Sequence, residues 1–169
     1  MRRGLEYRWI RNWLGPGVVQ GLTTRRQLTV GAVQIAAVYF EAADGPTILT
    51  ELVSPAGVQQ LRQLFLRMAE GGGPIRLGEQ PGVRLLNGLT IELSSGGDGF
   101  NRLRRTGSDL TFAWDATLDQ WRDTAAMVQA VYEHPGSHNY LADEPDTDAV
   151  MEITYGEPLL RRPSTEPAT

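Results

Sequence analysis

The segment from Leu28 to Ala43 constrains the fold of this chain most, because both of its alternating faces are apolar. Its β-branched and aromatic side chains include Val30, Val33, Ile35, Val38, Tyr39 and Phe40. An amphipathic helix would place polar residues along one side, whereas a strand that is covered on both faces reads as a nearly continuous apolar run. We therefore expect a strand here that is buried on each side.

Two helices are predicted farther along the chain by their caps. Ser54 followed by Pro55 is typical of a helix N-terminus, and a run of glycines would end this helix. Its expected apolar stripe is Val58, Leu61, Leu64, Phe65 and Met68. Thr117 and Gln120 predict a capping box for a second helix, which Pro135 would end. The stripe of the second helix is Leu118, Trp121, Ala125, Val128 and Tyr132.

The other apolar runs predict short strands joined by tight turns. Asp44-Gly45 separates the first strand from residues 47–53, which is a strong hairpin signal. Further strands are expected over residues 83–86, 89–93, 100–105, 110–114 and 149–155, with turns at Asn87-Gly88, 96–99 and 107–109 and a loop through Pro145 before the last strand. The expected fold class is α+β, with a mostly antiparallel meander sheet of about five to seven strands and two main helices packed on one face.

The length of 169 residues and the mass of 18.6 kDa fit one domain, which we expect over residues 1–156. Residues 1–17 fit either a short amphipathic N-terminal helix or an extended segment, because their apolar residues match both periods. Residues 157–169 contain three prolines and no apolar period, which predicts a flexible tail. The chain has no cysteine, so disulfides and thiolate zinc sites are excluded and the core must be held by packing alone.

Charge is distributed unevenly along the chain. There are 16 Arg, no Lys and 20 acidic residues, for a net charge of −4. Residues 1–105 carry 13 Arg and 8 acids, whereas residues 106–169 carry 3 Arg and 12 acids. A non-specific nucleic-acid binder needs a basic domain, so nucleic acid is not an expected partner. The longest apolar stretch is too short and too polar to span a membrane, so we expect a cytoplasmic protein with no membrane partner.

Catalysis would have to use the segment that holds the only two histidines, His134 and His138. Together with Asp143 they could bind a metal, and beside Ser137 one of them could act as the base for a nucleophile. A Pro-Gly pair interrupts the helix that would align the two rings, and the glutamate of the helical zinc-protease motif is absent. We therefore keep a small hydrolase or metal-dependent enzyme as the alternative and expect no catalytic or metal site as the first interpretation.

A third interpretation is an anion site. The glycine-rich turn over residues 96–99 precedes Arg102, Arg104 and Arg105, so backbone amides and guanidinium groups could bind a phosphate. No lysine follows in the order of a phosphate-binding loop, and no helix begins there. The pattern favours a hairpin turn followed by an arginine-rich strand edge.

The charge pattern favours an interaction module over an enzyme. The expected partner-binding residues are acidic side chains of the second helix and the following loop, with two N-terminal tryptophans: Asp119, Asp123, Asp143, Glu144, Asp146, Trp9 and Trp13. We expect a non-enzymatic protein with an acidic C-terminal docking surface, of the inhibitor or immunity type, that binds a basic protein partner and uses no cofactor. Opposite charge on the two parts of the chain would also suit a homodimer.

Overall fold

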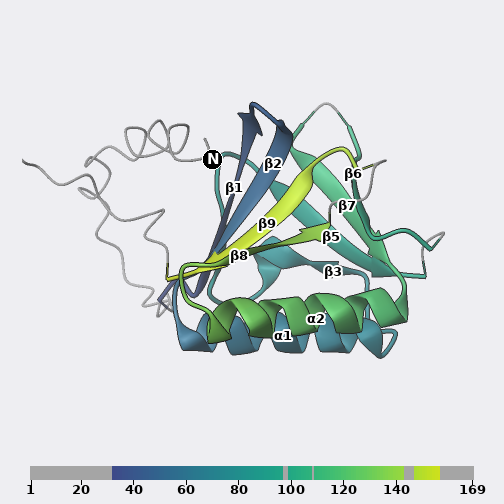
Figure 1. The fold of residues 1–169 in the computed structure, drawn as a ribbon. Helices are drawn as coiled ribbons and strands as arrows, with labels where there is room; N and C mark the ends of the chain where they lie inside the picture. The colour runs from purple at the N-terminus through teal and green to yellow at the C-terminus, as the bar shows by residue number, and fades with distance from the viewer. Residues whose placement is uncertain (1–31, 97–98, 108, 143–146, 157–169) are drawn as a thin grey trace, which may run out of the picture. The chain divides into compact units, whose positions relative to one another are not determined.

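The computed structural model describes residues 32–96, 99–107, 109–142 and 147–156 (Figure 1). The predicted N-terminal segment 1–17 and the tail 157–169 lie outside these residues. The elements of the described part are β1 (Ile35–Ala42), β2 (Gly45–Leu52), α1 (Pro55–Ala69), β3 (Ile75–Arg76), a 3-10 turn (Leu77–Glu79), β4 (Val83–Leu85), β5 (Thr90–Ser95), β6 (Arg102–Arg105), β7 (Thr111–Ala116), α2 (Leu118–Glu133), β8 (His138–Ala142) and β9 (Val150–Tyr155). This is the predicted α+β class, with both main helices at the expected places.

Both helices begin where their caps predict. The Ser54 hydroxyl accepts a hydrogen bond from the Gly57 N–H at 3.1 Å, which satisfies one of the free donors of the first turn of α1. At the start of α2, the Thr117 hydroxyl accepts from the Gln120 N–H, and the Gln120 side chain accepts from the Thr117 N–H at 2.8 Å. These reciprocal bonds are the predicted capping box.

The two helices lie side by side and run in opposite directions (Figure 1). The last residues of β5 fix this arrangement. The Ser95 hydroxyl donates to the Met68 carbonyl at 2.8 Å, near the end of α1. The Trp121 indole N–H donates to the Ser94 carbonyl at 3.1 Å, in the first turn of α2. The C-terminal end of α1 therefore lies beside the N-terminal end of α2.

The strands form two mixed sheets, so the predicted mostly antiparallel meander is only partly right: four of the seven strand pairs are antiparallel, but the strands form two sheets and not one meander. One sheet has the order β4-β1-β2-β9-β8 and the other has the order β3-β5-β7-β6. The pairs β1·β4, β2·β9 and β5·β7 are parallel. Asn87 and Gly88 do adopt positive φ angles, 57° and 77°, but this turn leads from one sheet into the other. The linker after β5 carries the chain past β7 to β6. Apolar periodicity identifies a strand without identifying its neighbours.

The two halves of the described chain repeat one order of elements. The first half is β1-β2-α1-β3-β5, with β4 added, and the second half is β6-β7-α2-β8-β9. In each half the first two strands form an antiparallel hairpin, and the last two form another antiparallel pair. The last strand of each half pairs in parallel with the second strand of the other half. Each sheet is therefore built from both halves.

One hydrophobic core lies between the helices and the facing sides of both sheets. Three of its rings contact one another: Phe65 of α1, Trp114 of β7 and Trp121 of α2 have centroids 5.0 to 5.4 Å apart. Along β1, Ile35 and Ala37 alternate with Ala36 and Val38, and all four are buried. The prediction of a strand buried on each side is thus confirmed for residues 35–38 of β1, and residues 28–31 of the predicted range lie outside the described residues.

Candidate functional site

The exposed face of α2 carries acidic residues that the sequence predicts for partner binding. The predicted Asp119 and Asp123 are exposed, and so is Glu133, while Trp121 and Val128, from the apolar stripe, are fully buried. A helix that buries one stripe must expose the opposite one, so the period that builds the core also decides which carboxylates face solvent. The other predicted partner-binding residues lie outside the described residues: Trp9, Trp13, Asp143, Glu144 and Asp146.

Two of the exposed large apolar side chains lie on this helix. Of the four such residues in the described part, Leu118 and Met127 belong to α2, Phe100 precedes β6, and Val53 precedes α1. The stripe prediction for Leu118 is wrong, because this side chain is 42% exposed. Leu118 is the first residue of α2, and a helical side chain covers the turn that precedes it, which is missing at the first position.

The segment that carries Phe100 is fixed against the first turn of α2. The Gln120 side-chain amide donates to the Gly99 carbonyl at 2.9 Å. The Arg102 guanidinium lies 5.0 Å from the centroid of the Phe100 ring, within the range of a cation–π contact. Phe100, 47% exposed, is thereby held beside the N-terminal end of α2. Sequence periodicity gave no signal for this placement, because it depends on a contact between two elements.

Strand β6 carries the three arginines of the predicted anion site, and a polar segment covers its outer edge. The Leu103 N–H donates to the Thr147 hydroxyl at 2.9 Å, and the Leu103 carbonyl accepts from the Asp148 N–H at 2.8 Å. The Arg105 N–H donates to the Asp148 carboxylate at 2.7 Å. Residues 147 and 148 thus satisfy backbone groups of Leu103 and Arg105 through one backbone and two side-chain hydrogen bonds, so these groups of the strand edge are not free to bind a further strand.

Arg105 also joins the two sheets through aromatic rings. Its guanidinium lies 5.7 Å from the ring centroid of Tyr39 in β1 and 5.9 Å from that of Phe112 in β7. The Tyr39 hydroxyl donates a hydrogen bond to Glu41. Partial burial raises the pKa of Tyr39, the hydrogen bond and charge of Glu41 raise it further, and Arg105 lowers it. These contacts give Arg105 a structural role.

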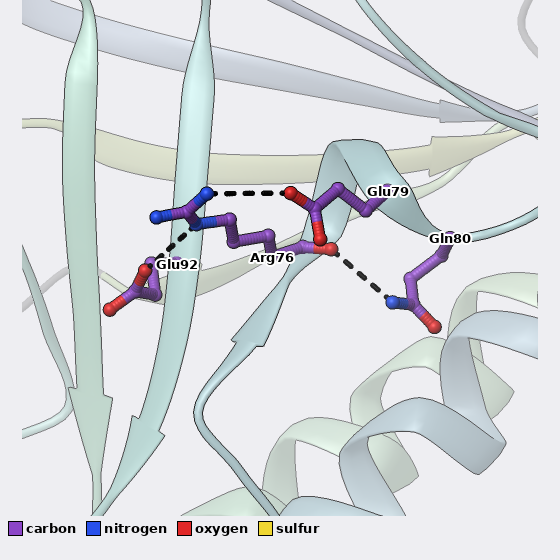
Figure 2. Close-up of polar contacts among 4 residues, drawn as sticks. All are labelled: Arg76, Glu79, Gln80 and Glu92. Atoms are coloured by element: carbon purple, nitrogen blue, oxygen red, sulfur yellow. Dashed lines mark hydrogen bonds and ion pairs between the residues drawn. The ribbon is translucent and has the colours of Figure 1, made fainter.

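Arg76 of β3 is placed among acidic groups beside the four-stranded sheet. Its guanidinium lies 3.2 Å from Glu92 of β5 and 3.4 Å from Glu79, and the Gln80 side chain donates to the Arg76 carbonyl at 3.3 Å. Figure 2 draws these contacts as dashed lines. The hydrogen bond with Glu92 and then that with Glu79 raise the pKa of Arg76. These groups are exposed, so their ion pairs add little to stability. Arg76 is balanced locally by two carboxylates, in contrast to the acidic excess of α2.

The residues of the catalytic alternative are spread over different elements. His134 follows the last residue of α2, and the Ser137 hydroxyl donates to the His134 carbonyl at 2.6 Å. The predicted loop is wrong over residues 138–142, which form β8 and pair with β9. His138 Nδ1 lies 3.9 Å from Oε1 of Glu152, a residue only 6% exposed. Among the residues that the structure describes, no group of three His, Asp or Glu side chains could hold a metal ion, and Asp143 lies outside them.

Comparison of this chain with family models, curated proteins and solved structures found no match. Within the described ranges, no helix has both the length and the apolar character needed to cross a bilayer. Function must therefore be inferred from the surface of α2 and its neighbours.

Proposed function

We propose that this chain is a non-enzymatic protein-binding module of the inhibitor or immunity type, and that it docks a basic protein on α2. The main supporting observation is that Leu118 and Met127 are exposed on the same helix as Asp119 and Asp123. Interfaces combine apolar anchors, which supply most of the binding energy, with charges, which steer association and select the partner. A basic protein with apolar side chains at the centre of its contact surface would fit both features.

The negative charge of this surface defines the class of partner. Residues 118–133 hold three carboxylates and one arginine, and Arg122 already forms an ion pair with Asp119. Residues 106–169 together carry 12 acids against 3 Arg. Such an excess attracts a basic protein over about one Debye length, roughly 10 Å at 0.1 M salt. Association should therefore slow as the salt concentration rises.

The test uses a partner that is cross-linked to the purified chain in lysate of the source cells, identified, and then expressed separately. Asp119→Arg combined with Asp123→Arg should weaken its binding at least about tenfold, because two attractive contacts become repulsive. Leu118→Ala combined with Met127→Ala should speed dissociation, because apolar anchors act mainly on the off-rate. Calorimetry measures the first effect and surface plasmon resonance the second.

A matched control is available in two exposed turn residues, Asp44 and Asp109. Asp44→Arg combined with Asp109→Arg changes the net charge by the same amount and should leave the affinity close to that of the wild type. Equal losses of binding in the two charge-reversed variants would refute a docking surface on α2. Thermal unfolding of each variant shows whether the fold is retained.

The alternative is a small hydrolase or metal-dependent enzyme that uses His134, His138 and Asp143. It is supported by one contact, that of His138 with buried Glu152 at 3.9 Å. A buried carboxylate that faces an imidazole is common where histidine acts as a base. Zinc titration of the wild type and of His138→Gln tests the metal-dependent form. A stoichiometric site that is lost in the variant would favour the enzyme, and no zinc binding would exclude this form.

A further inference from the structure

The two halves of this fold are incomplete without each other. Six residue pairs join β2 to β9, from Thr47 with Val150 to Leu52 with Tyr155. Six more join β5 to β7. A half that stood alone would leave the outer edge of its hairpin and of its last strand without these partners. Unpaired strand edges bind other strands readily, so each half is built to be completed by the other.

The core shows the same dependence. Phe65 of the first half packs against Trp114 and Trp121 of the second half, with ring centroids 5.3 and 5.4 Å away. All three side chains are fully buried. Burial of one such side chain contributes about 1.5–3 kcal/mol, so a separated half would expose a large apolar surface. The halves therefore contact each other as the subunits of an obligate complex do.

The chain passes from the first half to the second once, between Ser95 at the end of β5 and Arg102 at the start of β6. The Gly96 N–H donates to the Ala116 carbonyl at 3.2 Å, so the pairing of β5 with β7 extends to Gly96, next to the start of the linker. We propose that two copies of this chain complete the same fold by exchanging halves, with residues 32–96 of one copy paired with residues 99–156 of the other. Every strand pair and core contact described above is retained in this domain-swapped dimer, and only the linker changes its path.

The swapped dimer requires no outside partner, so this inference goes beyond the proposed function and does not rest on it. Within one copy the second half is present at an effective concentration in the millimolar range, so the monomer dominates in dilute solution. The dimer forms when chains refold at high concentration or when the linker cannot turn back. It presents α2 twice, and two docking faces on one particle would bind a multivalent partner with higher avidity.

Shortening the linker is the direct test. Strands β5 and β6 lie on either side of β7, which places them about 9.6 Å apart at two strand spacings. Deletion of residues 96–99 leaves two residues between Ser95 and Arg102, which reach at most about 10.5 Å and cannot pass around β7. We expect the deletion variant to sediment as a dimer with an unchanged far-ultraviolet circular dichroism spectrum. A Gly-Ser linker of the original length should keep the chain monomeric. A folded monomer of the deletion variant would overturn the proposal.

Complementation of two defective full-length chains is a second test, independent of the linker. Leu61→Asp in α1 and Val128→Asp in α2 each place a carboxylate at a fully buried position, so neither variant should fold alone. Refolded together, they can form one intact unit from the two unaltered halves. The near-ultraviolet signal of Trp114 and Trp121 should then recover to about half of the wild-type value. If the near-ultraviolet signal of the mixture is only the sum of the signals of the separately refolded variants, the proposal is overturned. This result decides the matter even if the deletion variant precipitates.

Discussion

The side chain of Asn101 joins the two sheets, and its removal should destabilise the fold more than its loop position suggests. Its oxygen accepts a hydrogen bond from the Trp114 indole N–H at 2.7 Å, and its nitrogen donates to the Leu141 carbonyl at 2.7 Å. Trp114 belongs to β7 of one sheet and Leu141 to β8 of the other. We therefore predict a large loss of stability for Asn101→Ala.

The size of this loss follows from the burial of the two partners. Trp114 and Leu141 are 0% and 1% exposed, so bulk water does not reach the groups that the amide leaves behind. A buried donor without an acceptor costs about 1–3 kcal/mol, and loss of the bond to the Leu141 carbonyl adds about 1 kcal/mol. The free energy of unfolding should fall by about 2–4 kcal/mol in total.

Urea unfolding in a double-mutant cycle tests the physical reason. In the Trp114→Phe background there is no indole N–H to leave unpaired, so Asn101→Ala should cost about 1–2 kcal/mol less than in the wild type. Equal costs in the two backgrounds would refute the hydrogen-bond explanation and assign the effect to lost packing volume. Similar slopes of free energy against urea concentration are needed for the comparison, because they show that the unfolded states are alike.

Two further predictions concern α1 and the junction of the sheets. Gly57→Ala should lower the free energy of unfolding in urea by about 1–3 kcal/mol, because the added Cβ would lie 2.1 Å from the Gln34 carbonyl oxygen. This loss is expected although alanine favours helices. A variant as stable as the wild type would contradict this close approach. The pKa of Tyr39 is raised from 10.0 in the folded state, so its stabilising effect is complete below that pH and is lost as the pH rises through the folded pKa. The difference in thermal stability between the wild type and Tyr39→Phe should therefore narrow above pH 10, and a constant difference would contradict the assignment.

The helices could be predicted from the sequence because their signals are local. Ser54 and Thr117 cap helices that begin within one residue of them, and the buried stripes follow the helical period. The sheets could not be predicted in the same way, because the partner of a strand is chosen by distant residues. The sequence places Thr47 in a strand, and nothing near it indicates that Val150 lies opposite.

The repeated order of elements also could not be predicted from the sequence, because equivalent positions of the two halves are buried alike but hold different residue types. Val58 and Trp121 both stand four residues after a cap and are both fully buried, yet they differ greatly in size. The exposure of Asp119 and Asp123 follows from the period of α2, so this part of the candidate site was predictable. The exposure of Leu118 was not predictable, because the helical period places this residue in the buried stripe. It is exposed because α2 begins at Leu118 and no preceding turn lies beneath its side chain.

The parallel pairing of β2 with β9 has a consequence for the time at which this chain can fold. Thr47 pairs with Val150, about 100 residues later in the chain, and contacts of such separation form slowly. A ribosome adds about 5–20 residues per second, so a newly made β2 waits roughly 5–20 seconds for β9 to emerge. The pace of synthesis therefore sets the interval in which β2 is open to mispairing.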